Sequence, residues 1–428
     1  MQIRKPTGVR LERKKEASLL NWNLKRPLPP EKISIPLSLA SLPCVRAGDA
    51  VQAGQMIAKP EGPKGVSVHA GIAGVVEKTG ILENGRNREI SAIGIRRQGE
   101  PKTVPAPDPR KGWEGIDSEE LLKIFRNSGL VMTNPGEEPV HVKIQRHVSA
   151  RSVIINGCEP EPYLTCEQVL IMSHPVEVLR GAEILRKACG AARIVFAFED
   201  TNLETIELIK SKIYFLKWEQ AEVRTVPAIY PQGLESTLLQ AWSRGKEDEA
   251  VVFPASTAFA AYEAVALQKP FYERVVTVGG ECVVEPRSLW LPLGVSFQDA
   301  IRACKGVMRE PEKVLMGGPM AGAEKKTGES FVTAGTSAIL ALPKEVVKKG
   351  KEEPCIRCGL CVDHCPVSLS PATITLAAEQ KEFGIAGAWD AADCIECGNC
   401  AYICPSNRPM LELIHLAKGH MRQVAAHG

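Results

Sequence analysis

The spacing of apolar residues changes several times along the chain, and each change predicts a different kind of element. Between Ile33 and Arg97, apolar and polar residues alternate in short runs that end at glycines, which predicts a β-rich unit. Between Ile116 and Tyr214, strand-like and helix-like stretches alternate, and this order predicts parallel strands joined by helices. The expected strands are 152–156 and 192–198, and the expected helices are 119–127, 175–189 and 202–214.

The pattern changes again toward the C-terminus. Two strand-like runs, 273–278 and 288–292, precede a helix expected over 295–304 with Ser296 as its N-cap, and this unit predicts a small β-grasp module. Farther along, 371–381 and 410–421 have helical patterns that lie between and after two cysteine-rich runs. We therefore expect the C-terminal part to be helical.

The β-rich unit is similar to the barrel-sandwich fold of biotinyl and lipoyl carriers, through Val45–Ala58 and Val66–Val76. Such carriers present a lysine at the tip of a tight hairpin between their two halves. Lys64 lies in the connecting loop, Glu61–Gly65, but it lacks the usual flanking pair. We therefore expect a structural module here and not a carrier.

Composition excludes several classes of protein. Hydrophobic residues make up 44% and charged residues 24% of the 428 positions, which is ordinary globular usage. The formal charge of +3 gives no sign of nucleic-acid binding. No stretch approaches the roughly 18 apolar residues of a membrane span, and the N-terminus lacks the apolar core of a signal peptide. We expect a cytoplasmic protein.

The first 26 residues are strongly basic, with eight lysines and arginines against two glutamates. One interpretation is a solvated, flexible tail. The other is a basic arm that contacts an anionic membrane surface or an acidic partner.

Cysteine spacing carries the strongest chemical signal. Of fourteen cysteines, eight lie in two runs that both read C-x2-C-x2-C-x3-C-P, the bacterial pattern for [4Fe–4S] clusters. Three thiolates of a run can surround one face of a cubane, Gly359 and Gly398 let the backbone approach the sulfides, and the fourth cysteine points toward the other cluster. Paired zinc sites are the alternative, but zinc explains neither the third and fourth cysteines nor the repeated Cys-Pro ending. The expected ligands are Cys355, Cys358, Cys361 and Cys404 for one cluster and Cys394, Cys397, Cys400 and Cys365 for the other.

The other six cysteines show no ligand spacing. Disulfides are not expected in a reducing compartment, so buried apolar thiols are the default interpretation. These residues are Cys44, Cys158, Cys166, Cys189, Cys282 and Cys304.

Motifs along nearly the full chain resemble, in their order, the C subunit of the Rnf electron-transport complex and, more remotely, the NADH-binding flavoprotein subunit of respiratory complex I. Besides the cysteine runs, the resemblance rests on Ile35–Ser38, Gly48–Asp49, Gly54–Gln55, Asn156–Thr165, Tyr230–Gly233, Arg274–Gly279 and Gly317–Gly322. The fold that this resemblance and the patterns imply is multidomain α/β. Its parts would be a basic extension (1–28), a β-rich barrel-sandwich hybrid domain (29–100), a degenerate FMN/NADH-type, Rossmann-like α/β domain (101–265), a β-grasp module of the soluble-ligand-binding type with a return segment (266–345) and a helical ferredoxin-like dicluster domain (346–428).

The chain departs from this family at the loop that would hold FMN. The family's glycine-rich loop, G-x-G-G-A-G-F-P-T-H-V-K, corresponds to 129–143, where Met132, Asn134, Pro135 and Glu137 replace glycines. Side chains at these positions block close approach, Pro135 withholds an N–H donor, and Glu137 and Glu138 add negative charge where a phosphate would lie. Two other family patterns are also altered, V-T-K-G-T to Val332–Thr336 with Ala334 and N-V-x-T to Phe253–Thr257.

These changes predict that the FMN and NADH site is lost. Glu159 and Glu161 remain, and in the family this acidic pair lies near the flavin and nicotinamide, but the two residues could equally order the loop before a helix. We assign no catalytic residue. The expected function is to pass single electrons through two [4Fe–4S] clusters between redox partner proteins of a multisubunit complex, with peripheral contact at the cytoplasmic membrane face and no nucleic acid. The alternatives are a working FMN-dependent NADH dehydrogenase subunit and a reductase of a corrinoid-type cofactor.

Overall fold

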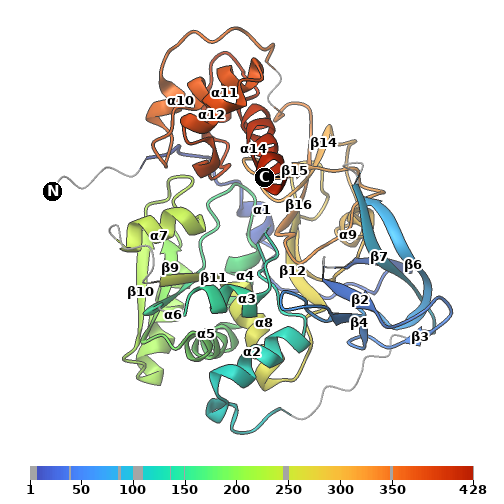
Figure 1. Ribbon diagram of the computed structural model, residues 1–428. Coiled ribbons are helices and arrows are strands. Elements are labelled where there is room, and N and C mark those ends of the chain that lie inside the picture. Colours follow the sequence, from blue (N-terminus) through green and yellow to red (C-terminus); the bar gives the residue numbers. More distant parts are fainter. Residues whose placement is uncertain are drawn as a thin grey trace.

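A computed structural model describes residues 7–37, 40–84, 88–99, 109–134, 136–148, 150–243, 250–347 and 350–427. The chain forms a body of three β-containing units, and a helical module at the C-terminus sits on one end of this body (Figure 1). Within these ranges, no helix has both the length and the apolar run that crossing a membrane requires.

Two small antiparallel sheets form the N-terminal unit, with strand orders β1-β7-β6-β3 and β2-β4-β5. The alternating side chains of β1 and β7, such as Ile33, Ile35, Ile93 and Ile95, are fully buried, as their period of two predicts. The β-rich expectation is therefore confirmed. The strands are β1 (Lys32–Pro36), β2 (Ser41–Pro43), β3 (Ala50–Val51), β4 (Met56–Pro60), β5 (Val68–His69), β6 (Gly74–Asn84) and β7 (Arg88–Arg97).

A four-stranded parallel sheet, ordered β10-β9-β8-β11, forms the middle unit. Its strands are nearly continuously apolar and buried because helices cover the sheet. The predicted parallel layer is confirmed. Its strands are β8 (Ser152–Asn156), β9 (Arg193–Glu199), β10 (Ala221–Val226) and β11 (Ala250–Pro254); its helices are η1 (Trp113–Gly115), α2 (Ser118–Asn127), α3 (Val140–Arg146), α4 (Cys166–Ser173), α5 (Pro175–Cys189), α6 (Leu203–Leu216), α7 (Glu235–Ser243) and α8 (Ala255–Ala266).

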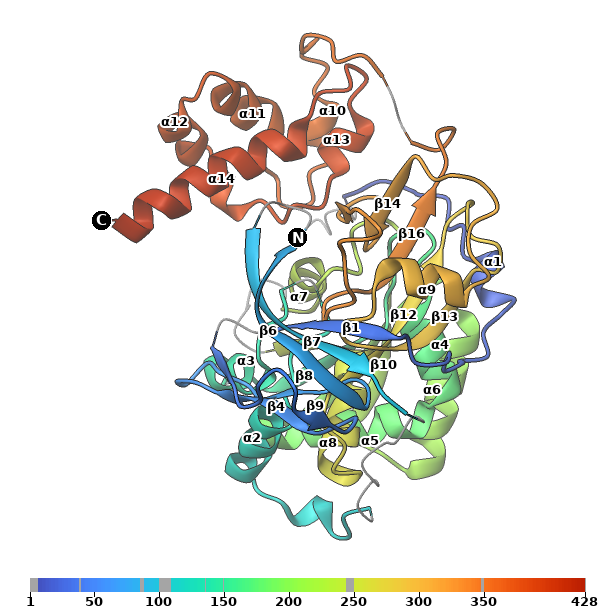
Figure 2. The same ribbon diagram turned by 90° about the vertical axis from the view of Figure 1, so that its right-hand side faces the viewer.

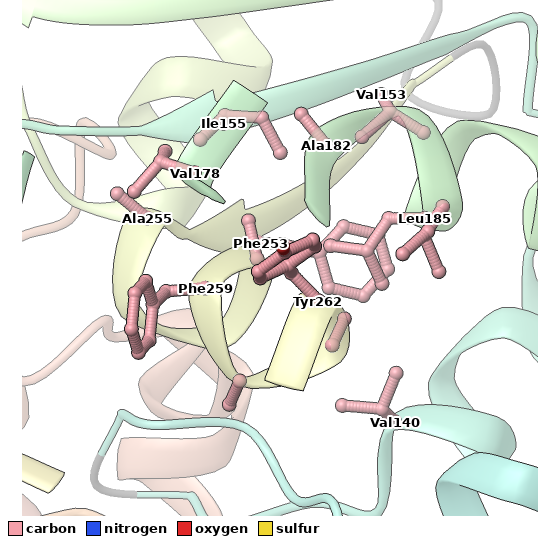
Figure 3. Close-up of a cluster of buried hydrophobic side chains, with 14 of the residues drawn as sticks. Val140, Val153, Ile155, Val178, Ala182, Leu185, Phe253, Ala255, Phe259 and Tyr262 are labelled. Carbon is pink, nitrogen blue, oxygen red and sulfur yellow. The ribbon is translucent and has the colours of Figure 1, made fainter. Parts of the chain in front are cut away.

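The core of this unit lies between the sheet and the helices α5 and α8 (Figure 3). Val153 and Ile155 of β8 pack with Val178 of α5 and with Phe253 at the end of β11. The two helices approach closely, since a Cβ on Gly181 would lie 1.8 Å from the Ala258 carbonyl oxygen. The expected strands and helices occur within two residues of their predicted limits.

A mixed five-stranded sheet, ordered β13-β12-β16-β14-β15, follows and shares its core with the N-terminal unit (Figure 2). The predicted N-cap is confirmed, because the Asp299 backbone N–H donates to Ser296 Oγ at 3.0 Å. The elements are β12 (Glu273–Gly279), β13 (Arg287–Pro292), α9 (Phe297–Ala303), β14 (Lys313–Met316), β15 (Ala323–Glu324) and β16 (Ala338–Leu342).

The C-terminal module is helical, as expected. Short helices that follow each cysteine run pack with two longer ones around Ile374, Ala378, Met410 and Ile414. The helices are α10 (Leu360–Asp363), α11 (Pro371–Glu379), α12 (Phe383–Ala388), η3 (Ala391–Asp393), α13 (Asn399–Ile403) and α14 (Met410–His427).

The interpretation of the N-terminal residues as a flexible tail is wrong for residues 7–28. This segment, which includes α1 (Glu16–Leu19), lies between the module and the body (Figure 1). Val9 pairs with Tyr230 in an antiparallel bridge, and the buried Lys15 ammonium donates to the Glu159 carbonyl oxygen at 2.5 Å. Apolar residues between the charges, such as Val9 and Leu11, explain the docking because they pack on Tyr230. Arg4 and Lys5 lie outside the described residues.

Candidate cluster sites and the adjoining cleft

The two cysteine runs fold in the same way. Arg357 and Glu396, each directly before the second cysteine of its run, have φ angles of 56° and 57°. Gly359 and Gly398, directly after that cysteine, have φ angles of 80° and 78° and cap α10 and α13. This left-handed backbone favours glycine, which explains why glycine follows the second cysteine in both runs.

The structure brings the cysteines together in the two crossed sets that the sequence predicts. One cavity is lined by Cys355, Cys358, Cys361 and Cys404, which we call the outer site. A second cavity is lined by Cys365, Cys394, Cys397 and Cys400, which we call the inner site.

Both sets of thiols have the chemistry and the spread that a cubane requires. Across the described ranges, no three Cys, His, Asp or Glu side chains converge closely enough to hold a single metal ion. Four thiols placed around a cavity instead suit a cluster with four corner irons. Burial raises the pKa of both Cys397 and Cys400 to about 12, so these ligands depend on the positive charge of iron to become thiolates.

The inner site adjoins a cleft of about 550 Å³ between the parallel sheet and the five-stranded sheet. The cleft is lined by residues at the carboxyl ends of β8 and β11, including Asn156 and Pro254, which is the usual place for ligands in a parallel α/β sheet. Its far wall includes Gly318 and Ala321. Next to Ala321, the Met320 carbonyl oxygen lies against Gly398 of the inner site, where a Cβ would come within 2.5 Å of it.

The two acidic residues that the sequence singled out both serve as acceptors for backbone N–H groups. Glu159 Oε1 and Oε2 accept from the N–H groups of Glu167 (3.0 Å) and Gln168 (3.1 Å) at the start of α4. Glu161 Oε2 accepts from Met320 (2.7 Å) and Ala321 (3.2 Å). These contacts order the loop before α4 and tie it to the far wall of the cleft.

A third cleft carboxyl was missed in the sequence. Glu167 is buried and accepts hydrogen bonds from the Ser256 backbone N–H (2.7 Å) and the Ser256 hydroxyl. Burial raises its pKa to about 7. Its place in the first turn of α4 gave no signal of this, because an acidic residue there is ordinary for a helix.

The loop in the glycine-rich position uses its own N–H groups internally. Met132 N–H donates to the Glu138 carbonyl oxygen at 2.7 Å, Thr133 N–H to Thr257 Oγ1 at 3.1 Å, and Glu137 N–H to the Asn134 carbonyl oxygen at 3.0 Å. Pro135 lies outside the described residues. N–H groups that already have acceptors are not available to a phosphate.

The Glu137 carboxylate itself takes up donors on the opposite side. Glu137 has a φ of 47°, and its Oε1 accepts from the Gly335 backbone N–H at 2.7 Å and from the Thr333 hydroxyl. Glu138 instead forms an ion pair with Arg146. Glu137 therefore places negative charge against the 333–336 turn, where the family sequence has a lysine in the position of Ala334.

Several residues of this region gave no usable sequence signal. Lys143 is buried and lies 2.5 Å from Glu235 Oε1. The fully buried Arg274 donates through Nη1 to the Thr133 carbonyl oxygen at 3.0 Å and also to that of Ala334, and so joins the loop to the 333–336 turn. For Arg274, a charge inside the apolar run of β12 was a possible signal of such a contact.

One prediction about the remaining cysteines is wrong. Cys44 is exposed, whereas the other five are buried. Cys44 follows directly after β2, an edge strand of only three residues, and its thiol donates at 3.7 Å to the Met56 carbonyl oxygen.

The fold and these sites define a class of protein: a dicluster iron–sulfur module joined to an α/β unit with a cleft. Family models agree in order along the chain. They are the RnfC barrel sandwich hybrid domain (residues 3–100), the Nuo51 FMN-binding domain (126–260), the SLBB domain (275–324) and the 4Fe-4S dicluster domain (342–408).

The chain belongs to the RnfC family. It is 31% identical over 366 residues to the RnfC-type protein of the proton-translocating ferredoxin:NAD(+) oxidoreductase complex of Clostridium ljungdahlii, which covers 82% of this chain and 79% of that protein. It is 33% identical over 379 residues to the corresponding protein of the Na(+)-translocating complex of Acetobacterium woodii, which covers 85% of this chain and 84% of that protein. A solved structure of an NAD+-reducing [NiFe]-hydrogenase in the H2-reduced state has a TM-score of 0.49 and 15% identity, over 75% of this chain and 63% of that chain.

Proposed function

We propose that the chain is an electron-transfer subunit that passes single electrons through two [4Fe–4S] clusters. The observation that carries this proposal is the pair of cavities, each lined by three cysteines of one run and the last cysteine of the other. The proposed ligands are Cys355, Cys358, Cys361 and Cys404 for the outer cluster and Cys365, Cys394, Cys397 and Cys400 for the inner cluster. When bound, such clusters supply one-electron redox chemistry.

We further propose that the FMN and NADH site is lost. Three backbone N–H groups of the altered loop have internal acceptors, and the Glu137 carboxylate occupies donors of Thr333 and Gly335. Without a flavin, a chain with only one-electron centres has no means of taking a hydride from NADH, which transfers two electrons together.

A working flavin site is the second candidate, and one observation favours it. The cleft at the carboxyl ends of β8 and β11 retains about 550 Å³, and the Nuo51 FMN-binding domain model matches this part of the chain. In that case the flavin phosphate would need donors other than those of the altered loop.

Both relatives are named as members of ion-translocating oxidoreductase complexes, which supports a role inside a multisubunit complex with redox partner proteins. We propose the same domain division as above, with the parallel sheet as a Rossmann-like domain and the five-stranded sheet as a β-grasp module. The SLBB model over 275–324 supports the latter assignment. Eight cluster thiols suit a reducing, cytoplasmic compartment, and we propose peripheral contact with the cytoplasmic membrane face through the host complex.

The test is the cofactor content of full-length protein purified without oxygen. We expect about eight irons and eight acid-labile sulfides per chain and no flavin in the supernatant after denaturation. Zinc in place of iron would refute the cluster assignment. One FMN per chain would leave the clusters in place and establish the second candidate.

A further inference from the structure

The two cysteine runs have the same backbone but opposite surroundings, and this difference separates the functions of the two cluster sites. Ile356 and Ile395 occupy equivalent positions, each directly after the first cysteine of its run. Ile395 is partly buried and packs with Tyr230, Cys397 and Val9. The Ile356 side chain is 66% exposed.

The inner site is covered from the side of the body. The N-terminal segment crosses it with Val9 and Leu11, Met320 packs against it, and Tyr230 donates a hydrogen bond to the Cys397 carbonyl oxygen at 2.7 Å. Cys397 and Cys400 are buried, and Cys394 is half-buried. A protein partner therefore has poor access to this cluster.

The outer site has one edge open to solvent. Cys358 is exposed and Cys355 is half-buried, in a loop with neither helix nor strand. Beside them, Val362 of α10 is 40% exposed. The exposed Arg357 forms no ion pair or hydrogen bond with any other residue in the described ranges, whereas its equivalent, Glu396, pairs with Lys418 and His415.

We propose that the loop Cys355–Cys358 is the docking port for a small one-electron carrier protein with acidic residues around its cofactor, and that the inner cluster is an internal relay. This inference rests on the proposed function. An apolar tip beside an exposed ligand suits the small interfaces of transient redox complexes, and the basic Arg357 complements an acidic rim. One electron leaves the reduced carrier and reduces the outer cluster by one, with no bond made or broken.

The first test uses full-length protein and a reduced plant-type [2Fe–2S] ferredoxin as an acidic probe, with cluster bleaching followed by anaerobic stopped flow. Ile356→Asp and Arg357→Glu should each slow reduction by ferredoxin at least tenfold and leave reduction by dithionite within twofold. Leu203→Asp is the matched control, because Leu203 on α6 is also 66% exposed and lies far from the module in the chain. It should change neither rate. Wild-type rates should also fall as salt rises, and less so for Arg357→Glu.

The second test removes one cluster at a time. Cys397→Ala, which keeps the outer cluster, should still be reduced by ferredoxin at the wild-type rate. Cys358→Ala, which keeps the inner cluster, should be reduced at least tenfold more slowly by ferredoxin. The reverse pattern, or port variants that behave like Leu203→Asp, would overturn the proposal. Protein without iron would instead refute the proposed function, so the two failures are distinguishable.

Discussion

The Tyr230 hydroxyl donates a hydrogen bond of 2.7 Å to the carbonyl oxygen of Cys397. Tyr230 lies in the loop between β10 and α7, and Gly233 and Leu234 of the same loop line the cleft. The Tyr230 backbone also exchanges hydrogen bonds of 2.8 and 2.9 Å with Val9. One buried residue therefore joins the cleft, the N-terminal segment and the inner cluster site.

Replacing Tyr230 with Phe should disturb the inner cluster selectively. The variant loses one buried hydrogen bond and leaves the Cys397 carbonyl without this donor, which should lower the free energy of unfolding by about 1–2 kcal/mol. In a redox titration followed by EPR, the potential of the inner cluster should shift while that of the outer cluster stays the same. Tyr214→Phe, at a side chain that is 87% exposed, is the control. Equal shifts of both clusters would contradict this role for Tyr230.

Crossed ligation predicts that each fourth cysteine matters to the cluster nucleated by the other run. Cys365→Ser should reduce the EPR signal of the inner cluster and spare the outer one, because Cys365 lies with Cys394, Cys397 and Cys400. Cys404→Ser should do the opposite. Iron content should fall from about eight to about four per chain in either variant. Loss of the outer signal in Cys365→Ser would show that each run holds its own cluster.

Local chemistry decided how much could be read from the sequence. The cysteine sets were predictable because ligand spacing within a run is local, and the β8 and α5 segments were predictable because burial imposes a period. The surroundings of those sites were not predictable in the same way. Val9 with Tyr230, Lys143 with Glu235 and Arg274 with Thr133 are contacts between distant segments, and no local pattern selects either partner.

The buried Glu167 predicts a specific dependence of stability on pH. Its pKa is raised from 4.5 to about 7, so the folded protein holds a proton that the unfolded chain releases in this range. Stability should therefore fall as pH rises from 4.5 to 7, by at most about 1.4 kcal/mol per pH unit, and level off above.

The comparison is wild type against Glu167→Gln in anaerobic urea unfolding between pH 5 and 8.5. Glutamine keeps the shape and carries no titrating charge, so wild type should lose stability relative to the variant by roughly 3 kcal/mol between the acidic and the alkaline limit. Glu161 and Glu263, whose pKa values are also raised by burial, contribute equally to both proteins and cancel. A difference independent of pH would show that Glu167 stays ionised in the folded protein.

The altered loop predicts that wild-type protein purifies without FMN and shows no absorbance change with NADH. Glu137→Gly is the most informative single change, because it frees the donors of Thr333 and Gly335 and places glycine at a φ of 47°. We expect weak FMN binding, measured by quenching of flavin fluorescence. Binding should stay weak because the Thr133 N–H still donates to Thr257 and Ala334 still replaces the family lysine.

Rebuilding the whole family loop is a poorer experiment, for a reason that the structure supplies. Met132 is 1% exposed and belongs to the hydrophobic core, so replacing it with glycine together with Asn134, Pro135 and Glu137 should destabilise the fold by about 2–5 kcal/mol. Changing Glu138 to Phe would also remove its ion pair with Arg146. Glu138→Gln is the control for Glu137→Gly, since it removes a charge outside the 333–336 turn and should leave FMN binding undetectable. One tightly held FMN in wild-type protein would refute the loss of the site, and the Glu137 carboxylate would then be compatible with a phosphate bound elsewhere in the cleft.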